Sequence, residues 1–226
     1  MKILIQGFKS MIPIIPGIIP FGAVMGSVSS EAGLSFFQTV MMNVLVFAGA
    51  AQLAALDLMK METPVIIVLI TGLIINLRFL LYSAAYSPVM QKSKLISRVF
   101  NSYFLTDQSY AVMSANEHRL SSNDQKIQFY LGAAVCMYIV WQISVIAGFV
   151  FGNFAPKSWA LEYAIPLSFV SLLIPSLKNN KYVIVALFSA VTSILLRPMT
   201  YNLGLIITAS LSILLGIYLS RKKKVL

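Results

Sequence analysis

Two charged residues lie well inside apolar stretches of the sequence, and they are its strongest candidates for chemistry. Asp107 is the only acidic residue in such a stretch, because the other six lie at or near segment ends. On a helix it shares one face with Tyr103, Tyr110 and Ser114. A carboxylate beside hydroxyls at membrane depth is typical of a water-filled transport cavity. The sequence therefore predicts a transport role for Asp107, and a structural acid paired to Arg78 is a compatible alternative.

Arg78 is the second charge at membrane depth. It shares a helical face with Tyr82, while Asn76, Ser83 and Ser87 form a second polar face of the same segment. A guanidinium in apolar surroundings needs a carboxylate partner or an anionic ligand. We therefore predict that Asn76 and Arg78 bind substrate. The alternative is an arginine whose long apolar stem lets its charge reach the membrane interface.

The segment over residues 11–31 contains six prolines and glycines, too many for one straight helix. An interrupted membrane helix presents a half-helix N-terminus, which attracts an anionic group such as a substrate carboxylate. A proline kink with only a packing role is the alternative. The predicted substrate-binding residues of this segment are Gly17, Pro20, Phe21 and Gly22.

Two further apolar stretches carry polar groups near their middles. Gln52 follows a run of small residues that would let two backbones approach closely. Tyr138, Trp141 and Gln142 lie together on one side of the stretch 127–153. We predict that Gln52, Tyr138 and Gln142 contact substrate, and an interhelical hydrogen bond is the alternative for each glutamine.

The elements that position these residues must lie in a membrane. Of the 226 residues, 58% are hydrophobic and 11% are charged, whereas ordinary globular domains have about 45–50% and about 25%. A soluble chain of this composition would expose large apolar patches, which excludes the soluble globular and disordered classes. The net charge is +10, but the basic residues do not form a face that is interleaved with aromatic residues. We therefore expect membrane lipid, and not nucleic acid, as its partner.

The apolar pattern predicts an all-α, polytopic membrane helix bundle that forms a single domain over residues 1–226. Two segments, 11–31 and 99–117, are embedded but carry breakers or polar residues, so we predict that they are broken or re-entrant. We predict about six regular spans beside them, at 36–59, 64–88, 127–153, 160–177, 182–196 and 199–219.

Charge counting favours re-entry of both interrupted segments. The side that holds both termini then carries thirteen basic residues, and the opposite side carries only Lys60, Lys157 and Arg197. This asymmetry predicts a cell-membrane protein with both termini in the cytoplasm. If both segments cross instead, 11–88 and 99–177 become two triplets of opposite orientation, an inverted repeat followed by two extra spans within 182–219. The inverted repeat is a hypothesis.

Enzymatic chemistry is poorly supported. His118 is the one histidine, Cys136 is the one cysteine, and metal catalysis usually needs three protein ligands. The sequence has neither a Gly-Lys-Ser/Thr phosphate loop nor a Gly-x-Ser-x-Gly nucleophile motif. We therefore predict no catalytic residue, no metal and no cofactor.

A set of short motifs together resembles the AzlC family. These are Pro20-Phe21-Gly22, Phe47 to Gln52, Asn76-Leu77-Arg78, Tyr82-Ser83, Ser87-Pro88, Leu105-Thr106-Asp107, and the pair Tyr138 and Trp141. The resemblance implies the large subunit of a branched-chain amino-acid exporter linked to azaleucine resistance. It also implies a small AzlD-type membrane subunit as partner.

The resemblance further implies secondary active export, by antiport, of leucine, isoleucine, valine and their analogues. The substrate carboxylate would meet Gly17–Gly22 or Arg78, and its ammonium would meet Asp107, Gln52 or an unwound carbonyl. Where relatives often have an acid after the aspartate and a histidine after the arginine, this chain has Gln108 and Phe79. Proton coupling then falls to Asp107 alone.

Two other classes of function remain open from the sequence. One is an intramembrane enzyme that uses Asp107 with a tyrosine or serine. The other is a non-transporting membrane scaffold or sensor, which leaves the polar faces at membrane depth unexplained.

Overall fold

The computed structural model describes residues 1–151, 173, 177, 179–199 and 203–221. Throughout these residues the regular elements are helices, as the sequence predicted. The chain divides into two compact units, Met1–Ser168 and Phe169–Leu226. The predicted span 160–177 and the basic tail beyond Arg221 lie outside the described residues, apart from positions 173 and 177.

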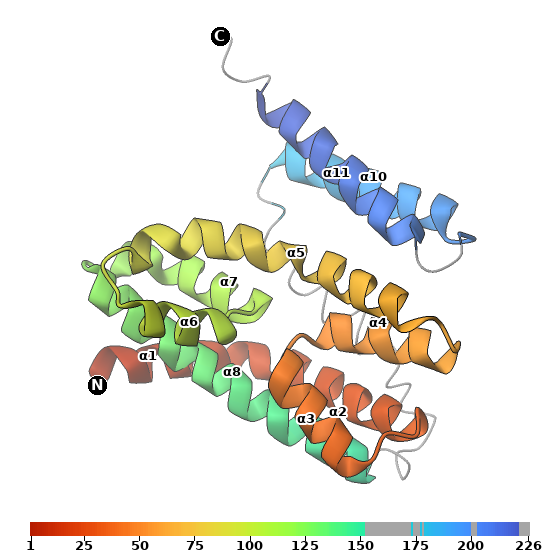
Figure 1. Ribbon diagram of the computed structural model, residues 1–226. Coiled ribbons are helices and arrows are strands. Elements are labelled where there is room, and N and C mark those ends of the chain that lie inside the picture. Colours follow the sequence, from red (N-terminus) through yellow and green to blue (C-terminus); the bar gives the residue numbers. More distant parts are fainter. Residues whose placement is uncertain (152–172, 174–176, 178, 200–202, 222–226) are drawn as a thin grey trace. The chain divides into compact units, whose positions relative to one another are not determined.

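Three long helical segments form the frame of the first unit (Figure 1). The first combines α1 (Lys2–Met11), the 3-10 turn η1 (Ile12–Ile14) and α2 (Ile15–Glu31), and the other two are α5 (Val65–Met90) and α8 (Asn123–Phe151). Each is long and apolar enough to cross a membrane. The 26 residues of α5 rise about 39 Å, more than the roughly 30 Å of a hydrocarbon core.

The predicted break in residues 11–31 is wrong. Pro13 and Pro16 lie in the first turns of η1 and α2, where a missing N–H costs little. The helix then runs on through Pro20 to Glu31. A short 3-10 turn therefore accommodates the prolines, and no free helix N-terminus forms near Gly17–Gly22.

The prediction of one regular span over 36–59 is also wrong, because this stretch forms two helices, α3 (Phe36–Val46) and α4 (Gly49–Lys60). The chain turns at Phe47, whose φ of 40° is left-handed. Glu31, at the end of α2, lies 3.7 Å from Lys60, at the end of α4. The pair α3–α4 therefore enters from one end of the unit and returns to that end (Figure 1).

The predicted interruption of residues 99–117 is confirmed. Helix α6 (Leu95–Tyr103) and helix α7 (Asp107–Asn116) are separated by three residues, and the 3-10 turn η2 (Glu117–Arg119) leads on to α8. Thr106 starts α7 through a capping box with Ser109. The pair α6–α7 enters from and returns to the end opposite to that of α3–α4 (Figure 1).

Close contact between α1–α2 and α8 holds the frame together. At Gly26 and Gly148 a Cβ atom would collide with the backbone of the facing helix, at Val145 and Ala23 respectively. Gly7 and Gly132 make the same kind of approach nearer the other end. Small residues at such positions let membrane helices pack backbone to backbone.

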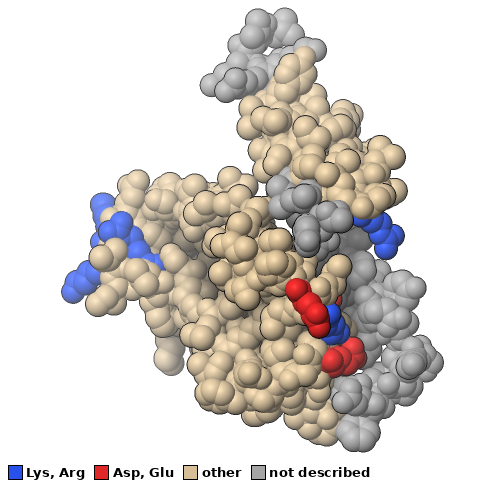
Figure 2. Space-filling view, turned by 45° about the vertical axis from the view of Figure 1, so that its right-hand side comes forward, with Lys and Arg blue, Asp and Glu red and all other residues tan. Residues whose placement is uncertain are grey.

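Charged side chains of the first unit gather at its two ends (Figure 2). The end where α5 meets α6 is basic, and the end where α2 meets α3 and α4 meets α5 carries three acids and one lysine. The basic end holds Lys2, Lys9, Lys92, Lys94, Arg98, Arg119 and Lys126, with Glu117 and Asp124, and the opposite end holds Glu31, Asp57, Glu62 and Lys60.

The second unit contains α10 (Asn180–Leu196) and α11 (Leu203–Arg221), which pack against each other. Asn179 caps the start of α10 by accepting from the backbone of Lys181 and Tyr182. The Lys181 ammonium donates to the Leu219 carbonyl near the end of α11, so the two helices are antiparallel. They match the predicted spans 182–196 and 199–219.

Candidate functional site

The two helix breaks meet in the interior of the first unit. In an unbroken helix the Val44 carbonyl would accept from the backbone N–H of residue 48. Here the Tyr103 hydroxyl, at the end of α6, donates to the Val44 carbonyl instead. The Ala48 N–H donates to the Gln52 side chain over 3.3 Å. The second break therefore supplies a donor for a carbonyl that the first break leaves unpaired, and Gln52 of α4 satisfies the N–H of Ala48.

Aromatic rings fill the space between the breaks. The Phe47 ring lies 5.0 Å from Tyr138 and 6.0 Å from Tyr103. Phe104, in the second break, lies 5.3 Å from Tyr138. We call these four rings the aromatic cluster. It places the predicted site residue Tyr138 beside both breaks, at the middle of α8.

A buried amide network joins α3 to α8 next to the aromatic cluster. Asn43 donates to the Gln142 side-chain carbonyl over 2.6 Å and accepts from the Trp141 indole over 2.6 Å. Asn43 itself is only 1% exposed. For Gln142 the interhelical hydrogen bond predicted as the alternative is therefore present. Sequence reasoning missed Asn43, although an asparagine in the apolar run 40–46 is itself a signal.

Phe21 and Gln52 lie against the same region. The Phe21 ring meets the Trp141 ring edge to face at 5.1 Å. A side chain at Gly49, the first residue of α4, would collide with both rings, so the start of α4 sits directly on them. Gln52 is fully buried, and its side-chain nitrogen has no partner. A polar group held without a partner in the interior is available to a ligand.

Arg78 and Asp107 form an ion pair at the second break. The guanidinium Nη1 lies 2.9 Å from the Asp107 carboxylate, and the two side chains are 26% and 16% exposed. Asp107 is the first residue of α7, so the break delivers its carboxylate to α5. The Arg78 Nε and Asp107 Oδ1 atoms are buried without a hydrogen-bond partner. The pairing predicted for these residues is thus confirmed, and each partner keeps a free polar atom.

Two stacked tyrosines flank the ion pair. Tyr82, one turn after Arg78, stacks on Tyr110 of α7 with ring centres 4.7 Å apart and planes at 18°. Tyr82 interacts electrostatically with both Asp107 and Arg78. On the other side of Arg78, the Asn76 side-chain oxygen is buried without a partner. Arg78 and Tyr82 of α5 therefore come together with Asp107 and Tyr110 of α7.

The predicted residues of α2 lie differently from expectation, apart from Phe21. A Cβ at Gly22 would lie 2.6 Å from the Ser144 side chain, so this glycine serves helix packing. Gly17 lies in the first turn of α2, which continues directly from α1 and η1, and Pro20 lies inside α2. The half-helix N-termini belong to α4, at Gly49, and α7, at Asp107.

These termini give the centre of the unit a defined electrostatic pattern. The N-termini of α4 and α7 and the C-termini of α3 and α6 all lie at the two breaks. Helix N-termini favour negative groups and C-termini favour positive groups. A zwitterion therefore finds complementary ends here. Discontinuous helices that bring such ends to mid-membrane depth are a feature of secondary transporters.

Membrane-spanning helices around a polar interior define an integral membrane protein with an embedded site. The family model of the AzlC protein matches residues 13–155, more than half of the chain. The chain therefore belongs to the AzlC family, which is a family of membrane transport proteins. The matched range includes every predicted site residue and both helix breaks.

Relatives from other organisms agree with this membership. An uncharacterized membrane protein of Archaeoglobus fulgidus is 28% identical over 179 residues, covering 77% of this chain and 76% of the relative. The inner membrane protein YgaZ of Escherichia coli is 24% identical over 186 residues, covering 78% and 74%. An uncharacterized membrane protein of Helicobacter pylori is 22% identical and covers 99% and 97%. No solved structure matches the chain.

Proposed function

We propose that this protein is the large subunit of a proton-coupled exporter of leucine, isoleucine, valine and their analogues, working with a small AzlD-type membrane subunit. Membership of a membrane transport family supports transport. The observation that carries the substrate and coupling is the ion pair between Arg78 and Asp107 at the second helix break. An acid and a base held together at this depth match the two charged ends of an amino acid.

The amino acid binds by inserting between the two charges. Arg78 takes the substrate carboxylate, and Asp107 takes the ammonium. Every charge stays paired, which avoids the large cost of leaving an ion alone in apolar surroundings. The unpartnered Arg78 Nε and Asp107 Oδ1 supply further hydrogen bonds. The nearby N-terminus of α7 favours the carboxylate.

The aliphatic side chain of the substrate lies toward the aromatic cluster. This cluster adjoins the second break through Tyr103 and Phe104, three to four residues before Asp107. An apolar surface distinguishes neighbouring side chains weakly, because one methylene contributes only about 0.8 kcal/mol. We therefore expect leucine, isoleucine and valine to be transported at similar rates. Gln52 and Asn76, each with an unpartnered polar atom, contribute the remaining polar contacts.

Coupling follows from competition for Asp107. A zwitterion carries no net charge, so its uphill export needs an ion. One proton entering across 100 mV supplies about 2.3 kcal/mol. A proton on the Asp107 carboxylate removes its attraction for the substrate ammonium. Proton and amino acid therefore exclude each other on Asp107, which is the condition for antiport.

The basic end of the first unit faces the cytoplasm in this proposal. The positive-inside rule places loops rich in lysine and arginine there. The N-terminus lies at that end, and the basic residues Arg221 to Lys224 support a cytoplasmic C-terminus by the same rule. The protein then resides in the cell membrane with both termini inside.

Leucine export from intact cells tests the proposal. Cells that lack their own exporter receive this chain with its small partner and are loaded with a leucine-containing dipeptide, and internal leucine is followed over time. We expect cells that carry the Asp107→Asn variant to retain as much internal leucine as cells without the chain. Asp57→Asn is the matched control, because Asp57 is exposed at the acidic end. Export by Asp107→Asn at the parental rate and equal protein level would overturn the role of Asp107.

A further inference from the structure

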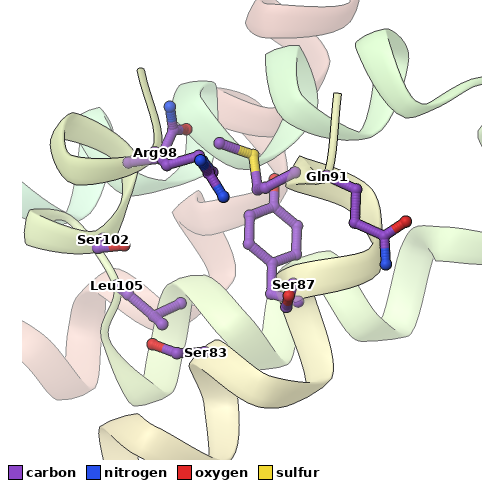
Figure 3. Close-up of a pocket in the computed structure, with 9 residues that line it drawn as sticks. Ser83, Ser87, Gln91, Arg98, Ser102 and Leu105 are labelled. Carbon is purple, nitrogen blue, oxygen red and sulfur yellow. The ribbon is translucent and has the colours of Figure 1, made fainter. Parts of the chain in front are cut away.

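A polar cavity lies between α5 and α6, between the ion pair and the basic end of the first unit. Its volume is about 230 Å³. Hydroxyls of Ser83, Ser87 and Ser102 and the guanidinium of Arg98 line it, together with Gln91 (Figure 3). No acidic residue lines this cavity in the part of the chain that the structure describes. Its charge is therefore positive and suits an anionic group.

Two buried polar atoms of the cavity wall have no hydrogen-bond partner among the described residues. They are the Tyr86 hydroxyl and the side-chain oxygen of Asn101, on residues only 7% and 3% exposed. Asn101 is held in place, since its nitrogen donates to the Ser97 carbonyl over 2.7 Å and its backbone carbonyl accepts from Tyr130 over 2.7 Å. Buried polar groups without partners are rare and call for an explanation. A ligand in the cavity provides one.

The cavity adjoins both polar faces of α5, because its wall residue Tyr86 follows Arg78 and Tyr82 at four-residue spacing on the face that carries Arg78. Ser83, Ser87 and Gln91 follow one another at four-residue spacing along α5. From Arg78 to Gln91 the helix rises about 20 Å. On the facing side, Leu105 lines the cavity and Asp107 follows two residues later. The cavity therefore leads from the basic end toward the ion pair.

We propose that this cavity is a loading site that binds the carboxylate of the amino-acid substrate before it reaches Arg78 and Asp107. The proposal rests on the export function proposed above. Arg98 pairs with the carboxylate and Tyr86 donates to it, while the Asn101 oxygen accepts from the ammonium. Met90 and Leu105 contact the aliphatic side chain.

Protection of an introduced cysteine tests binding without relying on transport. Ser87→Cys places a thiol in the cavity wall, and the native Cys136 is 1% exposed, so the parent chain serves as the unlabelled background. The protein is reconstituted with its partner in phosphatidylcholine vesicles and treated with a thiol reagent. We expect leucine to slow labelling of Ser87→Cys. Leucinamide, which has no carboxylate, should leave labelling unchanged.

The Arg98 side chain is then varied in the Ser87→Cys background. Arg98→Gln should raise the leucine concentration for half-protection about tenfold, since it removes a hydrogen bond to a charged group. Lys94→Gln removes an exposed cation just before α6; it is the control and should leave that leucine concentration unchanged. Equal protection by leucine and leucinamide, or equal effects of the two substitutions, would overturn the proposal.

Two further measurements separate the other outcomes. Protection by phosphatidylglycerol vesicles without leucine would assign the cavity to an anionic lipid headgroup and overturn the amino-acid assignment. Leucine efflux is measured on the same vesicles. Leucine efflux without protection of the cysteine would overturn the loading-site proposal and support the export function. Protection without efflux would support the loading site and count against export.

Discussion

Arg78 and Asp107 were the two charges that the sequence placed at membrane depth, and they lie 2.9 Å apart although 29 positions separate them. These two residues could be predicted as functional from the sequence, because charged residues are rare in apolar segments. The pairing itself was one of two alternatives, since spacing says nothing about contacts between segments.

The ion pair should appear in a double-mutant cycle of stability. Arg78→Gln and Asp107→Asn each leave a partly buried charge unpaired, so each alone should lower the free energy of unfolding. The double variant removes both charges. Its loss of unfolding free energy should be smaller than the sum of the losses in the two single variants, with a coupling energy of about 1–3 kcal/mol. Thermal and denaturant unfolding in detergent would measure it. Strictly additive effects would contradict the pairing.

Asn43 shows what residue-level reasoning could not reach. It is held by Trp141 and Gln142, almost 100 positions later in the chain. An asparagine in the apolar run 40–46 is a signal in itself, but nothing in the sequence indicates its partners on α8. Its importance arises only because the break after Val46 brings α3 against the middle of α8.

At the level of helices, the sequence predicted the number of interruptions but misplaced one of them. Prolines in 11–31 suggested a break, yet Pro13 and Pro16 occupy first turns that tolerate them, and α2 continues through Pro20. The stretch 36–59 has no proline and looked continuous, yet Phe47 adopts a left-handed conformation. Contacts of its ring with Tyr138 and Tyr103 accompany that turn. Such tertiary contacts leave no signal in local propensity.

Helix packing between α2 and α8 gives a matched pair of substitutions. A methyl group at Gly148 collides with the Ala23 backbone, whereas at Gly72 nothing lies within 4 Å. Gly148→Ala should therefore lower stability by about 1–3 kcal/mol through overpacking. Gly72→Ala should be neutral or stabilise by up to about 1 kcal/mol through helix propensity. Thermal unfolding followed by circular dichroism compares them, and equal melting temperatures would contradict this packing.

For the molecule as a whole, two helix pairs that enter from opposite ends distinguish this arrangement from a bundle of regular spans. The class of fold was predictable from composition, because a soluble protein with 58% hydrophobic residues would expose large apolar patches to water. The charge pattern also predicted that the basic residues of the first unit gather at one end. The return of α3–α4 to its own end of the unit was not predictable, because the apolar composition of this helix pair is the same as that of a single crossing helix.

Cysteine labelling from the two sides of the membrane tests this topology. Ser35→Cys and Thr63→Cys flank α3–α4 and should react from the same side. Ser93→Cys and Ser122→Cys flank α6–α7 and should both react from the other side. The buried Cys136 should give no background. Reaction of Ser35→Cys and Thr63→Cys from opposite sides would show that this stretch crosses the membrane.

The central claim is that Asp107 exchanges a proton for an amino acid. Purified protein with its small partner is reconstituted in vesicles loaded with leucine and an internal pH-sensitive dye. We predict that outward leucine movement acidifies the interior of parental vesicles, and that Asp107→Asn abolishes this acidification. Leucine leaving parental vesicles without proton uptake, or full proton uptake with Asp107→Asn, would contradict the account.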